Sequence, residues 1–409
     1  MDAQLAAALA YPGAVLLEGP RACGKSVTGR QHARSSVDLD LEPAAVQLAE
    51  LDPSALLAGA QPRFIDEWQL APQLWNHVRA AVDREGASFV LAGSAVPADD
   101  HTRHSGAGRV LRLPMRPMSL VESGHSSGAV SLGGLFQHPE ARVSGTSELT
   151  VPDYAELVVR GGWPGLLALP LQQALARTRS YLDDTARVDL PRLEGEPRRN
   201  PAAVLRVLRA LGRNTATEVA LTALARDASA GDEQMTADTA QNYLAALTRV
   251  FVVEDQPSWG PHLRSRDRVR KAPRRHFVDP SLAAAAVGAD ADRMLSDLEY
   301  FGQLFESLVI RDLRVYSQPL DGSVLHYRDS AGREVDAVVE LRDGRWAAIE
   351  VKLAEARADE AAASLFRFAA NLDNARTAPP TVMVIITGGK YAYTRSDGVH
   401  VVPIGTLAP

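Results

Sequence analysis

The stretch GPRACGKS at residues 19–26 has the G-x4-G-K-[ST] spacing of a phosphate-binding loop. Its glycines let backbone N–H groups turn towards the β-phosphate of a nucleotide. The ammonium of Lys25 would lie on the β- and γ-phosphates, and the Ser26 hydroxyl would bind magnesium. The expected nucleotide contacts are Gly19, Pro20, Arg21, Ala22, Cys23, Gly24, Lys25 and Ser26.

An acidic pair, Asp66-Glu67, follows a second apolar run. Asp66 would hold magnesium, and Glu67 would be the general base that activates water beside the catalytic Lys25. Ser94 ends the next apolar run and would sense the γ-phosphate, although serines there also cap turns. Arg109 would reach a γ-phosphate of its own or a neighbouring subunit, unless it is a solvated surface arginine. Together these residues predict hydrolysis of ATP with Mg²⁺.

A second group of reactive residues lies near the end of the chain. Asp336, Glu350 and Lys352 have the spacing Asp-x13-Glu-x-Lys, and Glu306 precedes them in a helical stretch. Glu350 and Lys352 are two residues apart on a strand and share a face, and a hairpin can bring Asp336 beside them. Asp336 and Glu350 would bind Mg²⁺ or Mn²⁺, while Lys352 would orient or deprotonate the attacking water.

This spacing is the signature of PD-(D/E)xK nucleases, in which Glu306 would complete the acidic pocket. Two other interpretations stay open. The residues could form a solvated, salt-bridged strand, or they could belong to a decayed nuclease that binds DNA without cutting it.

Candidate DNA contacts lie between these two groups. The net charge of -6 gives the chain no global attraction to nucleic acid, so a local patch must provide it. Residues 262–276 hold seven Arg or Lys and one acid, and could equally pair with acidic surfaces of the same chain. A helix over 236–250 could be the recognition helix of a winged helix. The candidates are Thr239, Gln241, Asn242, Arg264, Arg266, Arg268, Arg270, Lys271, Arg274 and Arg275.

Short apolar runs that alternate with helical patterns predict an α/β fold with a parallel sheet in the first 125 residues. We expect a P-loop AAA+ core over 1–125, a helical lid over 126–195, a winged-helix domain over 196–275 and a restriction-endonuclease-like α/β domain over 276–409. One cysteine permits no internal disulfide and favours a reducing, cytoplasmic setting. No apolar run approaches the roughly 20 residues that cross a bilayer, so we expect no membrane partner.

The order of the motifs resembles a family of prokaryotic AAA+ ATPases whose C-terminal part is a restriction-endonuclease-like domain of unknown function. The matching stretches run from residue 15 to about residue 354 and include LLEGPRACGKS, RFIDEWQLAP, LAGS, GAGR, VRGGWP, GREVDAVVE and IEVKLA. Two positions differ: Trp68 replaces an aliphatic residue, and Val335 stands where the nuclease signature has proline. Neither carries chemistry.

The resemblance and the motifs together predict an ATP-dependent protein that processes DNA with a metal-dependent nuclease. The alternative is a nucleotide-controlled switch or scaffold whose nuclease-like domain only binds a DNA or protein partner. A homo-oligomer and a monomer both stay open, since Arg109 could act between subunits or within one chain.

Overall fold

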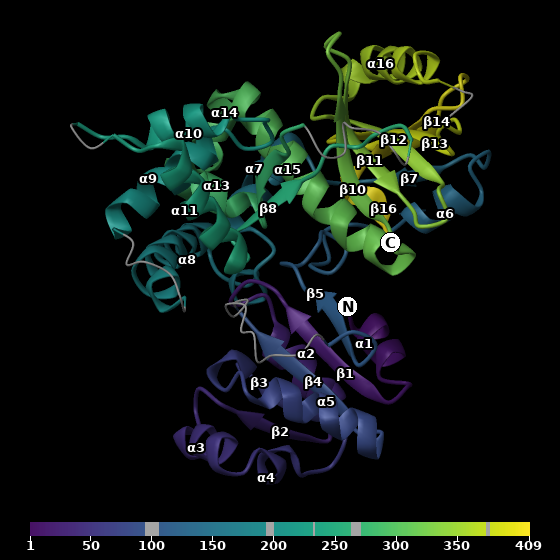
Figure 1. Ribbon diagram of the computed structural model, residues 1–409. Helices are drawn as coiled ribbons and strands as arrows, with labels where there is room; N and C mark the ends of the chain where they lie inside the picture. Colours follow the sequence, from purple (N-terminus) through teal and green to yellow (C-terminus); the bar gives the residue numbers. More distant parts are fainter. Residues whose placement is uncertain (95–105, 194–199, 232–233, 263–270, 374–376) are drawn as a thin grey trace. The chain divides into compact units, whose positions relative to one another are not determined.

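The computed structural model describes residues 1–94, 106–193, 200–231, 234–262, 271–373 and 377–409 (Figure 1). The chain forms two compact units. The first consists of Met1–Pro117, Arg187–Arg199 and Ala245–Val252, and the second of Met118–Ala186, Asn200–Leu244 and Val253–Pro409. Each unit has its own sheet.

The first unit contains a five-stranded sheet in the order β2-β3-β4-β1-β5, and all of its pairings are parallel. Its strands are β1 (Gly13–Glu18), β2 (Ser35–Asp38), β3 (Arg63–Asp66), β4 (Ser88–Gly93) and β5 (Val110–Pro114). Its helices are α1 (Asp2–Ala8), α2 (Lys25–His32), α3 (Pro43–Leu51), α4 (Pro53–Leu57) and α5 (Leu74–Glu85).

The central strands of this sheet are buried on both faces. Leu16 packs in one apolar cluster, whereas Val15 and Leu17, its neighbours in β1, pack in another. Alternate residues of a strand point to opposite faces, so helices must cover both faces of the sheet. The uninterrupted apolar runs of β1 and β4 follow from that burial.

The second unit contains a seven-stranded mixed sheet in the order β10-β11-β12-β13-β15-β14-β7. Strands β10, β11 and β12 are antiparallel neighbours, and β12, β13 and β15 run parallel. The strands are β7 (Ser144–Thr146), β10 (Ser323–Arg328), β11 (Glu334–Glu340), β12 (Trp346–Lys352), β13 (Val382–Thr387), β14 (Tyr391–Thr394) and β15 (His400–Pro403). Helices α15 (Leu298–Ser317) and α16 (Ala358–Ala370) pack against β11 and β12.

The remaining elements are mostly helical. They are α6 (Leu132–Gln137), α7 (Val151–Arg160), α8 (Leu171–Asp184), α9 (Pro201–Arg213), α10 (Leu221–Ala228), α11 (Ala237–Arg249), α13 (Pro280–Val287) and α14 (Ala291–Ser296). Strands β8 (Val253–Gln256) and β9 (Arg274–Phe277) form an antiparallel pair. Strands β6 (Val130–Ser131) and β16 (Leu407–Ala408) pair in parallel.

A buried ionic network joins the start of α13 to α15 in the second unit. The guanidinium of Arg311 donates to Asp279 at 2.9 Å and to Asp312 at 2.7 Å, and all three side chains are almost fully buried. Asp279 also accepts the backbone N–H of Gly162 at 3.0 Å, and Asp312 accepts that of Leu120 at 3.0 Å. These bonds compensate the charges that burial takes out of water.

This division differs from the expected domain boundaries. The segment 126–195, expected to be a separate helical lid, supplies β6 and β7, and these strands pair with β16 and β14 near the end of the chain. Most of that segment therefore belongs to the unit that contains the C-terminal sheet. No helix among the described residues is long and apolar enough to cross a membrane.

Candidate functional site

The phosphate-binding loop connects the end of β1 to the start of α2. Gly24 has a φ of 106°, in the left-handed region that favours glycine. A side chain at Gly19 would place Cβ 2.0 Å from the backbone oxygen of Met115. Both glycines are therefore required by the path of the loop.

Lys25 is buried, and its Nζ donates to the backbone oxygens of Gly19 at 2.9 Å and Pro20 at 2.7 Å. Backbone dipoles thus hold the ammonium against the loop itself. A nucleotide would exchange these two carbonyls for phosphate oxygens, which carry full charge and make stronger bonds.

The acidic pair lies at the carboxyl end of β3, at the same edge of the parallel sheet as the loop. Asp66 is buried and accepts a hydrogen bond from Ser26; burial raises the pKa of this carboxyl, which the bond from Ser26 opposes. A hydroxyl and a carboxylate side by side are oxygen donors of the kind that Mg²⁺ prefers. Ser26 and Asp66 therefore fit a magnesium ion bound together with nucleotide phosphates.

Two neighbours hold the carboxylate of Glu67. Its Oε2 accepts from Ser94 Oγ at 3.2 Å and from Nε2 of Gln69. Oε1 of Gln69 is buried and has no hydrogen-bond partner in the described part of the chain. Gln69 is not among the residues expected from the sequence, where its position two residues after Glu67 is the signal that points to it.

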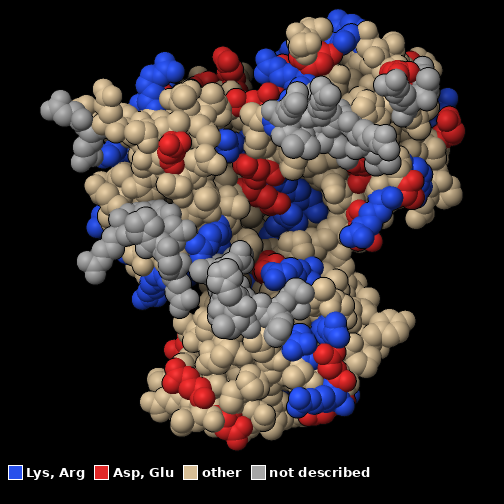
Figure 2. All heavy atoms as spheres, viewed as in Figure 1, with Lys and Arg blue, Asp and Glu red and all other residues tan. Residues whose placement is uncertain are grey.

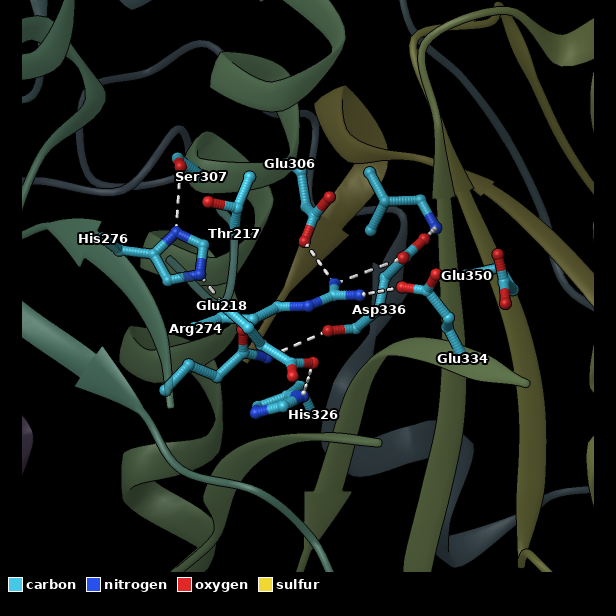
Figure 3. A network of polar contacts seen from close by, with 12 residues as sticks. Thr217, Glu218, Arg274, His276, Glu306, Ser307, His326, Glu334, Asp336 and Glu350 are labelled. Atoms are coloured by element: carbon cyan, nitrogen blue, oxygen red, sulfur yellow. Dashed lines mark hydrogen bonds and ion pairs between the residues drawn. The ribbon is translucent and has the colours of Figure 1, made fainter. Parts of the chain in front are cut away.

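The second group of residues meets in the other unit, around Asp336 on β11 (Figure 3). Lys352 Nζ donates to Glu350 Oε2 at 2.7 Å and to Asp336 Oδ2 at 3.2 Å. The backbone N–H of Val351 donates to the same Asp336 oxygen at 2.9 Å. The hairpin β11–β12 thus brings Asp336, Glu350 and Lys352 together, as their spacing predicts. Glu306 on α15 is connected to them by one more side chain.

That side chain is Arg274 of β9. Its guanidinium donates to Glu306 Oε1 at 2.8 Å, to Glu334 Oε2 at 2.7 Å and to Asp336 Oδ1 at 3.4 Å. Its side chain is 6% exposed, so its charge is balanced by these carboxylates and not by water. Figure 3 shows the guanidinium reaching between the acidic side chains.

The carboxyl groups of this cluster titrate differently. Burial, followed by the negative charge of Asp336, raises the pKa of Glu306 to about 8 and that of Glu350 to about 7. Burial opposes ionisation of Asp336 too, but Lys352 and then Arg274 bring its pKa below the usual value. Asp336 is therefore the carboxylate that stays ionised and anchors both cations.

A buried polar chain fixes β9 behind this cluster. His276 shares hydrogen bonds with Ser307 Oγ at 2.9 Å and with Gln256 Oε1 at 3.0 Å. Gln256 Nε2 donates to the backbone oxygen of Asp336 at 2.9 Å. The β8–β9 pair is thereby bonded to both α15 and β11.

The family comparisons divide the chain into three parts. Residues 11–123 match the AAA domain family. This part of the chain is an AAA domain. The P-loop, Asp66 and Glu67 all lie within this AAA domain. Residues 151–293 and 301–407 match two domains of unknown function, DUF8612 and DUF4143.

No curated protein matches the sequence. Among solved structures, similarity is found to a Walker-type ATPase of Pyrococcus abyssi, with 15% identity, a TM-score of 0.41 and coverage of 70% of this chain and 94% of that one. The replication initiator DnaA bound to AMPPCP and single-stranded DNA gives 11% identity and a TM-score of 0.28, with coverage of 60% and 86%. Drosophila ORC bound to DNA gives 12% identity and a TM-score of 0.22, with coverage of 65% of this chain and 86% of that one.

Three expected residues of the AAA domain have distinct placements. Arg109 precedes β5, and its backbone oxygen accepts a hydrogen bond from the backbone N–H of Ala14 near the start of β1. It therefore lies at the amino ends of the parallel strands, whereas the loop lies at their carboxyl ends. Its side chain pairs with Asp83 at 2.8 Å, so Arg109 does not reach the nucleotide site of its own chain. Cys23 is buried, which raises the pKa of its thiol, and Arg21 pairs with Asp189 at 2.6 Å.

The candidate DNA contacts are divided among different environments. Thr239, Gln241 and Asn242 are exposed near the start of α11, as expected. Arg274 is buried among carboxylates and presents no free charge to a phosphate backbone, which corrects its assignment as a surface contact. Arg275 pairs with Asp255 at 3.5 Å, and Lys271 donates to the backbone oxygen of Arg328. Arg264, Arg266, Arg268 and Arg270 lie outside the described residues.

The face of the molecule in Figure 2 is not uniformly basic. In Figure 2, Lys and Arg side chains are interspersed with Asp and Glu on the side in view. The described residues also contain no group of three or more His, Cys, Asp or Glu side chains placed to hold a metal ion. Around Asp336 the physical reason is visible, because two cationic side chains already occupy its carboxylate oxygens.

Proposed function

We propose that the AAA domain binds ATP with magnesium and hydrolyses it. The observation that carries the proposal is the meeting of Lys25, Ser26, Asp66 and Glu67 at one edge of the sheet, although the two pairs are far apart in the sequence. When bound, magnesium would neutralise charge that develops on the phosphates. Ser26 and Asp66 would hold it.

The remaining residues would act on phosphate and water. Lys25 would stabilise negative charge on the β- and γ-phosphates, and Glu67 would accept a proton from water. Ser94 is bonded to Glu67 and would fix its carboxylate near the γ-phosphate.

Phosphate release by purified protein tests this proposal. Lys25→Ala and Glu67→Gln should each lower kcat by about 100-fold or more, since general bases alone contribute about 10²–10⁴-fold. Lys390→Ala is the matched control, because that exposed lysine belongs to the other unit, where it pairs with the exposed Glu148. Equal turnover by parent and Lys25→Ala would exclude the proposed site.

We further propose that the second unit acts on DNA through a PD-(D/E)xK-type site. What supports this is the bonded set of Asp336, Glu350 and Lys352 on a β-hairpin flanked by α15 and α16. Helices α9, α10 and α11 followed by the β8–β9 hairpin have the order of elements of a winged helix, with Gln241 and Asn242 as candidate base or phosphate contacts.

DNA shift and cleavage assays with Mg²⁺ or Mn²⁺ separate the alternatives. A nuclease predicts that Asp336→Ala stops cleavage while ATP hydrolysis continues. A switch or scaffold predicts a DNA shift without cleavage, or no shift at low salt. Sedimentation with and without ATP tests whether the chain forms the homo-oligomer that an Arg109 contact between subunits requires.

A further inference from the structure

The cation at the centre of the nuclease-like site is a side chain. Arg274 has one nitrogen, Nη1, shared by Glu306 and Asp336, and the other, Nη2, bonded to Glu334. These three acids come from two elements, α15 and β11, and the guanidinium bonds to all three of them (Figure 3). It therefore does what a bound divalent ion does in a carboxylate cluster, which is to hold several carboxyl groups together.

The oxygens that a metal ion would need are taken. Oδ1 of Asp336 faces Arg274, while Oδ2 accepts from both Lys352 and the backbone of Val351. The Oε2 atom of Glu350 is bonded to Lys352, and its Oε1 accepts from Ser364 at 3.3 Å. A divalent ion at Asp336 would have to displace a cationic nitrogen.

The positive charge of Arg274 also opposes a divalent ion at this site. A divalent ion placed beside Arg274 would lie close to a buried guanidinium, and that repulsion is strong where little water screens it. Removal of Arg274 would leave Glu306, Glu334 and Asp336 without their shared partner, which is the condition under which a carboxylate cluster gains most from a metal ion. Arg274 and a metal ion are thus alternative occupants.

We propose that Arg274 is an internal lock of the nuclease-like site, which holds its carboxylates in a metal-free state and must leave before a divalent ion can bind. The lock is well positioned. Two residues further along β9, His276 is fully buried and bonded to Ser307 and Gln256, so the backbone of Arg274 is fixed while its side chain alone spans the site. This inference rests on the proposed nuclease-like site and is independent of ATP hydrolysis.

Manganese binding to the full chain tests the lock. Mn²⁺ would be titrated without nucleotide and the free ion measured by electron paramagnetic resonance, for the parent, Arg274→Gln, Arg275→Gln and the double variant Arg274→Gln/Asp336→Asn. Arg275→Gln is the matched control, because it removes the adjacent arginine of β9, whose partner is Asp255. We expect Arg274→Gln to gain one site at least about tenfold tighter than any in the parent. The control should match the parent, and the double variant should lose the gained site.

Thermal unfolding with and without millimolar Mn²⁺ covers the case in which Arg274→Gln folds poorly. The ion should raise the midpoint of Arg274→Gln and leave the parent and Arg275→Gln unchanged. Equal Mn²⁺ binding by parent and Arg274→Gln, or an unstable Arg274→Gln that Mn²⁺ does not restore, would overturn the lock. If Arg274→Gln gains a Mn²⁺ site but cleaves no DNA, the result supports the lock and contradicts the proposed nuclease activity.

Discussion

Gly19 offers a sharp test of how closely the phosphate-binding loop packs. A Cβ added at Gly19 would lie 2.0 Å from the backbone oxygen of Met115, and real Cβ atoms essentially never approach within 3.0 Å. Gly19→Ala must therefore move one of the two backbones by at least about 1 Å. Met115 is itself bonded to Glu18 of β1 at 2.7 Å, so the strain falls on the point where β1 enters the loop.

The expected magnitude follows from overpacking, which costs about 1–3 kcal/mol when the surroundings cannot yield. If that strain is relieved by displacing the loop, ATP affinity falls by roughly 5- to 150-fold, because about 1.4 kcal/mol corresponds to a tenfold change. Titration with a fluorescent ATP analogue measures the affinity, and urea unfolding measures the stability of the same protein.

Gly302→Ala is the matched control for this experiment. Gly302 lies in α15, and apart from its chain neighbours and its own helix backbone no described atom comes within 4 Å of its added Cβ. Alanine in a helix interior is favoured over glycine by about 0.5–1 kcal/mol, so the control should bind ATP normally and be slightly more stable. If Gly19→Ala binds ATP as tightly as the parent and unfolds at the same urea concentration, the loop accepts a Cβ at this position without strain.

Three further predictions address other residues. Burial and the charge of Arg274 lower the pKa of His326 from 6.5 to about 4, so this group stabilises the fold above pH 6.5 and loses that contribution as pH falls towards 4. In the parent, the free energy of unfolding should fall between pH 7 and pH 4 as His326 is forced to take up a proton. In His326→Gln that fall should be smaller by up to about 3 kcal/mol in urea titrations, and an unchanged pH profile would contradict this. Arg311→Met leaves two buried aspartates without their cation and should cost about 3–5 kcal/mol in the same assay, whereas a change below about 1 kcal/mol would show that the network is dispensable. Gln69→Ala frees the carboxylate of Glu67 and should lower the kcat of ATP hydrolysis about tenfold with KM little changed; a KM effect alone would assign Gln69 to binding.

Much of the AAA domain could be predicted because its signals are local. The apolar runs of β1, β3 and β4 are buried on both faces, and the loop motif fixes the turn between β1 and α2. Strand β5 was not predicted, because its sequence VLRLP forms a partly exposed edge with an arginine in it. Because β5 was not recognised, the position of Arg109 at the amino ends of the strands, away from the loop, could not be inferred.

The candidate nuclease-like site was only partly predictable. The spacing of Asp336, Glu350 and Lys352 is visible within one hairpin, where two-residue periodicity decides which side chains share a face. Arg274 was interpreted as part of a basic stretch, since nothing local distinguishes it from its neighbour Arg275. Its partners are 32 to 62 residues away in sequence, and burial beside them is a property of the tertiary fold.

The pairing of β6 with β16 has a consequence for synthesis on the ribosome. Ser126, just before β6, donates to the backbone oxygen of Leu407, 281 residues further along, and β7 likewise pairs with β14. The segment that follows the AAA domain therefore emerges long before the strands that complete it. A shortened chain that ends at residue 195 would carry β6 and β7 without β16 and β14, and such unpaired strand edges invite aggregation.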